Sequence, residues 1–474
     1  MKLPEQSDQP VGEQPTDAKQ RIRSRKLLVA CLVFFTAFGV RLLNWQSNRG
    51  EVAGVQTSVA LNYKHLAGLI HQNGLASLYD PSSTTSNPDL LGHPPGYPIL
   101  LSLVYKVAGD SDTSVQFVQM ILDSLSAVII LLIAAELFPV AVSLIAGLMA
   151  AFAPQFSWNS ILLLPDSLAA LPILLALLLI TRVAVAQAFL PLHSEKNDKF
   201  QKGGDAGKKG RHESLSYMLA AGALIGVSCW LRANVLVLAP FLALSFLLIF
   251  RRGERLRPAL MLVFGACLII SPLTIRNALV FGKFIPVSLG AGQTLIEGIA
   301  DYNTDGTLGL PQTDMELIRG EAETYQRRDY ANSLFTPDGP ARDRARLARG
   351  FAVIRTHPVW FVGVMIQRAA SMLKLERTPL RLPLNASSKP VLLQWPLRAV
   401  QKLFITAIFL PLVLLGAGLL IYERRFQLLA FLLAVPCYYF CVQSALHTEY
   451  RYVLVIHYFL FVLAAVALRV IGSR

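Results

Sequence analysis

The chain has 474 residues, of which 54% are hydrophobic and only 16% are charged, whereas soluble globular chains carry about 25% charged residues. The apolar residues gather in blocks of about 17–25 residues, the length that a helix needs to cross a bilayer, which excludes an ordinary soluble enzyme. The net charge of +14 does not predict nucleic-acid binding, because Lys and Arg concentrate in the linkers between these blocks, where they anchor helix ends.

The N-terminal segment is polar and basic. Residues 1–25 predict a disordered cytoplasmic tail, and an apolar block follows at 27–44. This block lacks the small-residue cleavage site of a secretory signal, so we interpret it as a signal anchor and the first span. The stretch 45–114 predicts a long outer loop. Within it, Val59–Ile70 has the apolar spacing of a helix that lies on the membrane surface.

Further apolar blocks predict an all-α, polytopic transmembrane bundle of about ten spans. A second long outer loop is predicted at 276–402, in which 359–374 forms a surface or re-entrant helix. We divide the rest of the chain into an N-terminal transmembrane module, a flexible basic cytoplasmic linker and a C-terminal transmembrane module, at 26–190, 191–214 and 215–474. The blocks after the first span lie at about 115–137, 139–155, 161–184, 215–232, 234–250, 259–275, 403–421, 427–444 and 451–470.

The orientation of the bundle follows from the positive charges in its short linkers. With the basic N-terminal tail inside, counting spans places three other basic linkers inside as well, in agreement with the positive-inside rule. Both long loops then face outward, and we expect a multi-pass protein of the bacterial inner membrane whose active face is periplasmic. These linkers contain Lys196–Arg211, Arg251–Arg257 and Arg424–Arg425.

Several charged and polar residues stand at the outer ends of predicted spans, where the membrane disfavours them. Each alone is explained as an interface anchor or a snorkelling helix end. Span counting nevertheless places the whole set at one membrane face, beside both long loops. Carboxylates and guanidiniums at one depth suit an anionic lipid headgroup and an acid–base reaction. The set consists of Asp166, Arg232, Arg276, Asn277, His447, Glu449 and Arg451.

The first outer loop contains the sequence His93–Pro94–Pro95–Gly96–Tyr97–Pro98. The prolines fix the backbone, and Gly96 permits a close approach. His93 and Tyr97 are therefore candidate substrate-binding residues. The alternative interpretation is a rigid turn that sets a surface helix against the bundle.

The five cysteines all fall inside apolar blocks and read as small core residues, without the spacing of a metal site. No ligand spacing demands a cofactor, and we predict no metal-binding residue. A divalent cation between acidic residues is left open.

Taken in order, these motifs resemble the GT-C superfamily of lipid-linked-sugar glycosyltransferases. The similarity is to the bacterial branch that resembles dolichyl-phosphate-mannose protein mannosyltransferases and aminoarabinose transferases, and it covers residues from about 27 to 470. The motifs are Tyr63–Ala67, Pro94–Pro98, Pro165–Ser167, Leu231–Asn234 after Gly222 and Gly226, Pro272–Asn277, Phe281–Gly282, Gly290–Gly292 and Glu449–Tyr452.

The resemblance implies transfer of a sugar from a polyprenyl-phosphate donor to a lipid, glycan or protein acceptor on the extracytoplasmic face. A carboxylate would deprotonate the acceptor hydroxyl, cationic side chains would stabilise the departing phosphate, and the anomeric centre would invert. Asp166 matches the family's second acidic position, and Arg232, Arg276 and Arg451 would contact the phosphate. Membrane lipids are the other expected partners, and no nucleic acid is expected.

The chain departs from the family where an acidic residue usually precedes the tyrosine that matches Tyr63. Here Ser58–Asn62 contains no carboxylate. Glu51, the nearest carboxylate upstream, becomes the candidate for that catalytic role, although it also reads as a solvated loop charge. The absent acid keeps two alternatives open: a transporter or flippase for lipid-linked glycans, and a catalytically inactive GT-C paralogue.

Overall fold

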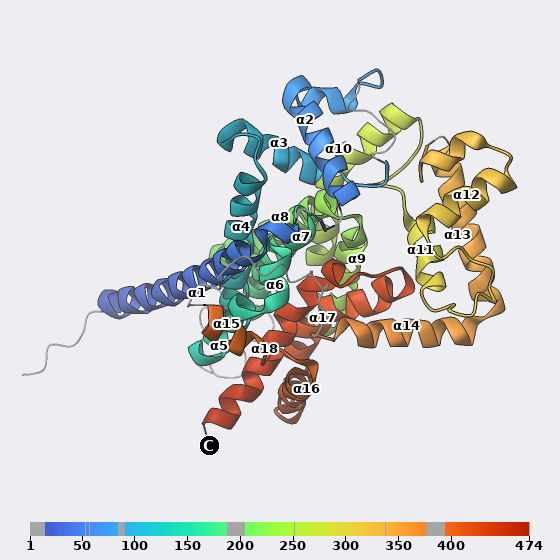
Figure 1. The fold of residues 1–474 in the computed structure, drawn as a ribbon. Coiled ribbons are helices and arrows are strands. Elements are labelled where there is room, and N and C mark those ends of the chain that lie inside the picture. The colour runs from blue at the N-terminus through green and yellow to red at the C-terminus, as the bar shows by residue number, and fades with distance from the viewer. Residues whose placement is uncertain are drawn as a thin grey trace, which may run out of the picture.

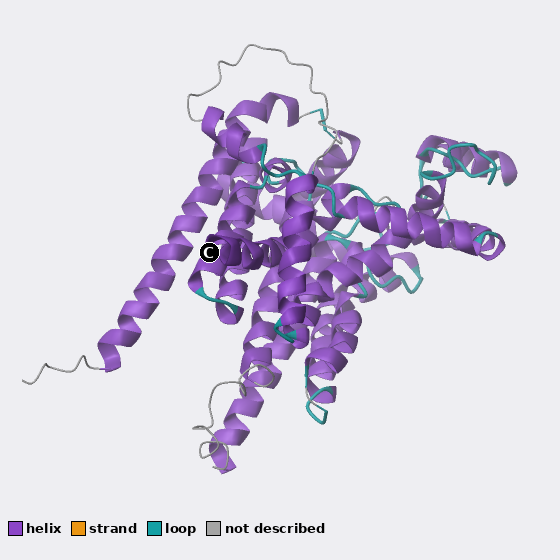
Figure 2. Ribbon diagram, turned by 90° about the horizontal axis from the view of Figure 1, so that it is seen from below, coloured by secondary structure: helices purple, strands orange, loops and turns teal. Residues whose placement is uncertain are grey.

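The computed structural model describes residues 15–52, 54–55, 57–83, 91–186, 204–250, 252–336, 338–375 and 394–473. Across these residues the regular structure is entirely helical, as Figures 1 and 2 show. The predicted all-α class is therefore confirmed.

The N-terminal half of the bundle contains both long membrane-crossing helices and short surface helices. The predicted surface helix at Val59–Ile70 is present as α2. The elements are α1 (Pro15–Val52), α2 (Thr57–Asn73), η1 (Leu75–Tyr79), α3 (Gly96–Ala108), α4 (Asp112–Leu137), α5 (Val140–Phe152), α6 (Pro154–Asn159) and α7 (Asp166–Ala184).

The C-terminal half adds further bundle helices and a group of outer helices between them. Its elements are α8 (Gly204–Leu231), η6 (Ala233–Val235), α9 (Leu238–Ile249), α10 (Leu256–Phe281), α11 (Ala291–Ala300), α12 (Asp314–Thr324), η7 (Arg328–Asn332), α13 (Gly339–Thr356), α14 (Pro358–Met372), α15 (Gln394–Gln401), α16 (Thr406–Tyr422), α17 (Phe426–Val442), η8 (Gln443–Ala445), η9 (Tyr450–Val453) and α18 (Leu454–Gly472).

Seven helices among the described residues are long and apolar enough to cross a membrane, and the bent pair α15–α16 could form an eighth span. The chain is thus a multi-pass membrane protein, but the predicted count of about ten spans is not confirmed. Two predicted spans correspond to the short apolar helices α5 and Ala233–Ile249. At 1.5 Å per residue, the 13 residues of α5 reach only about 20 Å, less than the ~30 Å hydrocarbon layer.

Two helices begin earlier than the predicted module boundaries. Helix α1 starts at Pro15, inside the predicted tail 1–25. Helix α8 starts at Gly204, inside the predicted linker 191–214. Arg, Lys and Gln are good helix formers, so a transmembrane helix can extend into water through such residues. The remainder of both predicted segments lies outside the described residues.

A buried ion pair and a close helix–helix contact stabilise the bundle. In its interior, the Arg41 Nε of α1 donates to the Asp123 Oδ2 of α4 at 2.6 Å, and both side chains are buried. Elsewhere, α8 and α10 approach so closely that a Cβ on Gly222 would lie 1.9 Å from the carbonyl oxygen of Leu262. Small residues allow such close helix packing in membranes, and here the packing fixes the path of α8 toward its end at Leu231.

The outer helices α11–α14 project to one side of the bundle (Figure 1). Their centre is a buried triad in which Arg342 and Arg346 both donate to Glu321, with the closest contact 2.6 Å from Arg346 Nε to Glu321 Oε1. Helix α14 covers most of the segment 359–374, which was predicted not to span, and it is not among the candidate spans.

Candidate functional site

Three charged side chains from distant parts of the chain meet at one face of the bundle. Asp166 is the first residue of α7, Arg232 directly follows α8, and Arg451 lies in η9 at the start of the last span. The chain enters its span at Asp166 and Arg451 but leaves one at Arg232. All three therefore lie at the same face of the membrane, each at the end of a different span, as counting spans along the sequence predicted.

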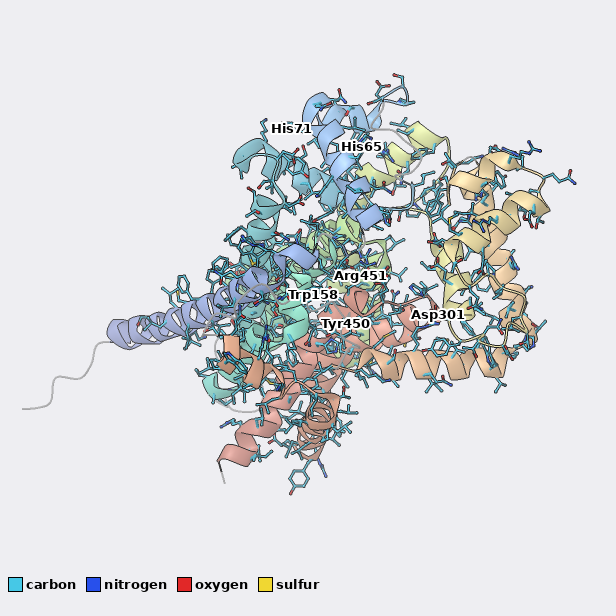
Figure 3. The ribbon with its side chains drawn as sticks, viewed as in Figure 1. His65, His71, Trp158, Asp301, Tyr450 and Arg451 are labelled. Atoms are coloured by element: carbon cyan, nitrogen blue, oxygen red, sulfur yellow. The ribbon has the colours of Figure 1, made fainter. Side chains whose placement is uncertain are left out.

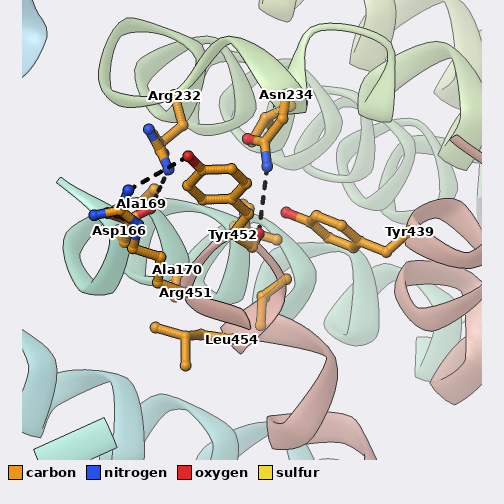
Figure 4. Close-up of a pocket in the computed structure, with 12 residues that line it drawn as sticks. Asp166, Ala169, Ala170, Arg232, Asn234, Tyr439, Arg451, Tyr452 and Leu454 are labelled. Carbon is orange, nitrogen blue, oxygen red and sulfur yellow. Dashed lines mark hydrogen bonds and ion pairs between the residues drawn. The ribbon is translucent and has the colours of Figure 1, made fainter. Parts of the chain in front are cut away.

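The three side chains form a nearly buried charge cluster (Figure 4). Arg232 Nη2 makes an ion pair with Asp166 Oδ1, and Arg451 Nε lies 4.0 Å from Asp166 Oδ2. The side chain of Asp166 is only 2% exposed, against 16% for Arg232 and 9% for Arg451. A charge taken out of water needs a partner of opposite sign, so Asp166 compensates the buried guanidiniums.

Tyr452 and Glu449 close this cluster into a ring of contacts. The Arg232 guanidinium stacks on the Tyr452 ring at 4.2 Å from its centroid. Tyr452 Oη donates to Glu449 Oε1 at 3.2 Å, and Arg451 Nη2 donates to the same oxygen at 2.7 Å. Arg451 in turn faces Asp166. Two carboxylates and two guanidiniums thus alternate in sign around the ring, and Tyr452 links Arg232 to Glu449.

A small pocket opens beside the ring. Asp166, Arg232, Arg451 and Tyr452 form its polar side. Most of the other lining side chains are apolar, so the charged groups stand beside the bundle core. The other lining residues are Ala169, Ala170, Ile173, Asn234, Val235, Tyr439, Leu454 and Val455.

The first outer loop packs against this cluster. The Tyr63 ring of α2 lies 5.3 Å from the His93 ring and 5.1 Å from the Tyr97 ring. Burial, together with the nearby Arg232 guanidinium, lowers the pKa of His93 to about 4. His93 is therefore a neutral imidazole at pH 7 and not a cation.

Gly96 explains how the loop is held. A Cβ at this position would lie 2.4 Å from the carbonyl oxygen of Trp230, two residues before Arg232. Tyr97 is buried beneath it, and its hydroxyl donates to Gln119 Oε1 at 2.6 Å. Gly96 and Tyr97 thus form the rigid turn of the alternative interpretation. The substrate-binding role of His93, which stands near the charge cluster, stays a prediction.

Arg276 and Asn277 lie elsewhere and hold backbone. Arg276 Nε donates to the Leu78 carbonyl at 3.0 Å, and its Nη1 donates to Asn277 Oδ1 at 2.9 Å. The Asn277 amide donates to the carbonyls of Ile285 and Val287. Neither residue lines the pocket. The pair instead joins α10 to η1 of the first outer loop and to the start of the second.

His447 points toward the outer helices. Its Nδ1 lies 2.8 Å from Asp301 Oδ2, and this hydrogen bond raises the pKa of His447. Figure 3 shows Asp301 on the side of the outer helices and Arg451 in the bundle. His447 therefore helps to attach the outer helices beside the site, and its neighbour in sequence Glu449 reaches the ring.

Glu51 lies in the last turn of α1, and its side chain is outside the described residues. The assignment of Glu51 as a catalytic residue therefore stays a prediction. Among the described residues, no group of three or more His, Cys, Asp or Glu side chains could hold a metal ion.

Several residues of the site were not predicted. Tyr452 was only part of a motif, although an aromatic residue next to a boundary arginine is a signal for cation–π stacking. Asn234 donates to the Tyr452 carbonyl at 3.3 Å, and Tyr439 lines the pocket. A single amide or tyrosine in an apolar block gives no sequence signal for such a role.

Comparisons with known proteins assign the fold of the chain. A model of the family "Dolichyl-phosphate-mannose-protein mannosyltransferase" matches residues 92–190, which include His93, Tyr97 and Asp166. An oligosaccharyltransferase from Archaeoglobus fulgidus is similar over 94% of this chain and 50% of its own, with a TM-score of 0.51 and 17% identity. The chain has a GT-C fold.

Two further structures are similar. The oligosaccharyltransferase AglB of the same archaeon, in complex with an inhibitory peptide and a dolichol-phosphate, aligns with 95% of this chain and 51% of its own, with a TM-score of 0.51 and 18% identity. ArnT from Cupriavidus metallidurans in the apo state aligns with 96% of this chain and 78% of its own, at a TM-score of 0.35 and 15% identity. None of the curated protein sequences matches significantly.

The chain spans about half the length of the archaeal oligosaccharyltransferases. The shared fold confirms the resemblance that the ordered motifs predicted. The match at 92–190 begins one residue before His93 and includes the start of α7 at Asp166.

Proposed function

We propose that this chain is a membrane glycosyltransferase that moves a sugar from a polyprenyl-phosphate donor to a lipid, glycan or protein acceptor. The observation that carries the proposal is the pair of guanidiniums, Arg232 and Arg451, held against the buried Asp166 at the ends of three spans. A phosphate at the membrane boundary is the anion that such a pair fits.

The kinds of residues at the site agree with a lipid-linked donor. The guanidiniums of Arg232 and Arg451 line the pocket together with apolar side chains such as Ile173, Leu454 and Val455. A polyprenyl phosphate likewise joins a charged head to a hydrocarbon tail. The dolichol-phosphate in the archaeal neighbour's complex agrees with this class of ligand.

The reaction is a displacement at the anomeric carbon. The acceptor oxygen forms a bond to that carbon, while the bond from carbon to the phosphate oxygen breaks and its electron pair leaves with the phosphate. Arg232 and Arg451 stabilise the charge that grows on the leaving oxygen. Attack opposite the leaving group inverts the anomeric configuration. Asp166 keeps both guanidiniums in place before the donor arrives.

The proposed site faces away from the cytoplasm, because the basic linkers lie at the other membrane face by the positive-inside rule. In a bacterium this face of the inner membrane is periplasmic. Acceptors there are reached from the two outer loops. The first flanks the ring at His93, and the second reaches it through the contact of Asp301 with His447.

The test uses purified protein in detergent with undecaprenyl-phosphate-linked mannose as donor and an extract of the source cell envelope as acceptor pool. We expect acceptor-dependent release of undecaprenyl phosphate. Arg232→Ala and Arg451→Ala should each lower the rate by about 10²–10³-fold, the usual loss of one electrostatic contact to a leaving charge. Asp166→Asn should lower it as well.

The matched control is Arg182→Ala, an arginine near the opposite end of α7 whose side chain is 47% exposed; its rate should stay at the wild-type value. Full turnover by Arg232→Ala would remove the guanidinium pair from the reaction. Movement of intact donor across liposome membranes, without release of undecaprenyl phosphate, would support a flippase instead.

A further inference from the structure

The proposed reaction needs a base, and the ring holds two carboxylates in different states. Asp166 is buried and faces a guanidinium from each oxygen, Oδ1 toward Arg232 and Oδ2 toward Arg451. The side chain of Glu449 is 33% exposed. Its two hydrogen bonds, from Arg451 and Tyr452, both end on Oε1. Oε2 of Glu449 makes no hydrogen bond or ion pair with the described part of the chain.

We infer that Glu449 is the catalytic base. In the empty site Arg451 holds Glu449 at the edge of the ring, and the donor phosphate replaces Glu449 as the partner of Arg451 when it binds. This inference rests on the proposed function. The alternating ring is its physical basis: a phosphate that binds Arg232 and Arg451 competes directly with the carboxylates that hold them in the empty site. Glu449, the more exposed carboxylate, is the one that can turn toward an acceptor.

Hydrogen bonds hold the loop before Glu449 and so fix the position of this residue. The Thr448 hydroxyl donates to the carbonyls of Gln443 and Leu446 at 2.8 and 2.9 Å. The His447 backbone amide donates to the Thr294 carbonyl of α11 at 2.7 Å. Glu449 therefore stands where the bundle and the outer helices join, and an acceptor bound between the outer loops would approach from this side.

The step balances without another reactant. Glu449 takes the proton of the acceptor hydroxyl as its oxygen bonds to the anomeric carbon, and the phosphate leaves with the electron pair of the broken bond. The products are the glycosylated acceptor, free polyprenyl phosphate and protonated Glu449, which returns its proton to water. General bases of this kind contribute about 10²–10⁴-fold.

Two other carboxylates of the outer loops have partners away from the ring. Asp301 contacts His447 and lies 3.8 Å from Arg368. Asp80 is exposed beyond η1 and accepts from the Ser82 backbone and hydroxyl. Neither carboxylate contacts a residue of the ring, whereas Glu449 contacts two.

The deciding experiment compares Glu449→Ala with wild type in the release assay, with and without sodium azide. Azide attacks the anomeric carbon without a proton to lose, so it needs no base. We expect acceptor-dependent release to fall by about 10²–10⁴-fold in Glu449→Ala, and azide to restore release with formation of glycosyl azide. Glu423→Ala, an exposed glutamate at the loop between α16 and α17, is the matched control and should behave as wild type.

A binding measurement separates a base from a positioning residue. Glu449→Gln should bind undecaprenyl phosphate at least as tightly as wild type, because Arg451 no longer has to leave a carboxylate, whereas Arg451→Ala should bind it more weakly. An unchanged rate in Glu449→Ala, absence of azide rescue, or weakened binding in Glu449→Gln would each overturn the inference. Wild-type protein that releases no undecaprenyl phosphate would overturn the proposed function itself.

Discussion

Gly96→Ala tests whether the first outer loop positions the charge cluster. The added Cβ would lie 2.4 Å from the Trp230 carbonyl oxygen, whereas ordinary contacts begin at 3.4 Å. Backbone on one side or the other must therefore move by about 1 Å, and Arg232 follows Trp230 by two residues. A misplacement of this size at a reacting site costs about 10²-fold in rate, while overpacking of this kind costs only about 1–3 kcal/mol in stability.

The assay is donor turnover together with the melting temperature in detergent. We expect turnover to fall by about 10²-fold in protein that still folds. Gly68→Ala in α2 is the matched control, because a Cβ there meets nothing within 4 Å. Wild-type turnover in Gly96→Ala would refute the claim that contact between the loop and α8 sets the position of Arg232.

Three further changes have defined outcomes. Asp123→Asn should cost ~3–5 kcal/mol of stability, because the buried Arg41 loses its charged partner. A strongly lowered melting temperature would show this loss. Arg276→Ala should release η1 from α10, seen as faster proteolysis near Leu78. Burial and then Asp314 raise the pKa of Glu297 to about 8 from 4.5. Protonated Glu297 gives its full contribution to the stability below pH 4.5. This contribution is lost as the pH rises to about 8, by up to ~1.4 kcal/mol per pH unit. Glu297→Gln should therefore melt higher than wild type at pH 9 and show a weaker fall between pH 5 and 9; equal curves would contradict the shift.

The bundle and the convergence of its charges followed from the sequence because membrane physics is strict. Apolar blocks must be helices, and alternating spans place Asp166, Arg232 and Arg451 at one face without any knowledge of packing. The same rule failed to fix the span count. Hydropathy does not show that α5 is a short helix, or that α15 and α16 bend by 58°.

The details of the site depend on packing that a sequence pattern does not contain. Arg276 resembles Arg232 in sequence context, yet Arg276 binds the Leu78 carbonyl while Arg232 pairs with Asp166. The difference arises from the elements that each helix end meets. Arg41 and Asp123 were missed for a similar reason, because two charges in separate apolar blocks reveal their pairing only when α1 and α4 lie together.

The central claim is that Arg232 and Arg451 receive the phosphate of a polyprenyl lipid. The most direct measurement is a cryo-EM structure of the protein with undecaprenyl phosphate. We expect the phosphate within hydrogen-bonding distance of both guanidiniums, the lipid chain along Leu454 and Val455, and Arg451 separated from Glu449. A phosphate bound elsewhere, with the ring of Asp166, Arg232, Glu449 and Arg451 unchanged, would contradict the account.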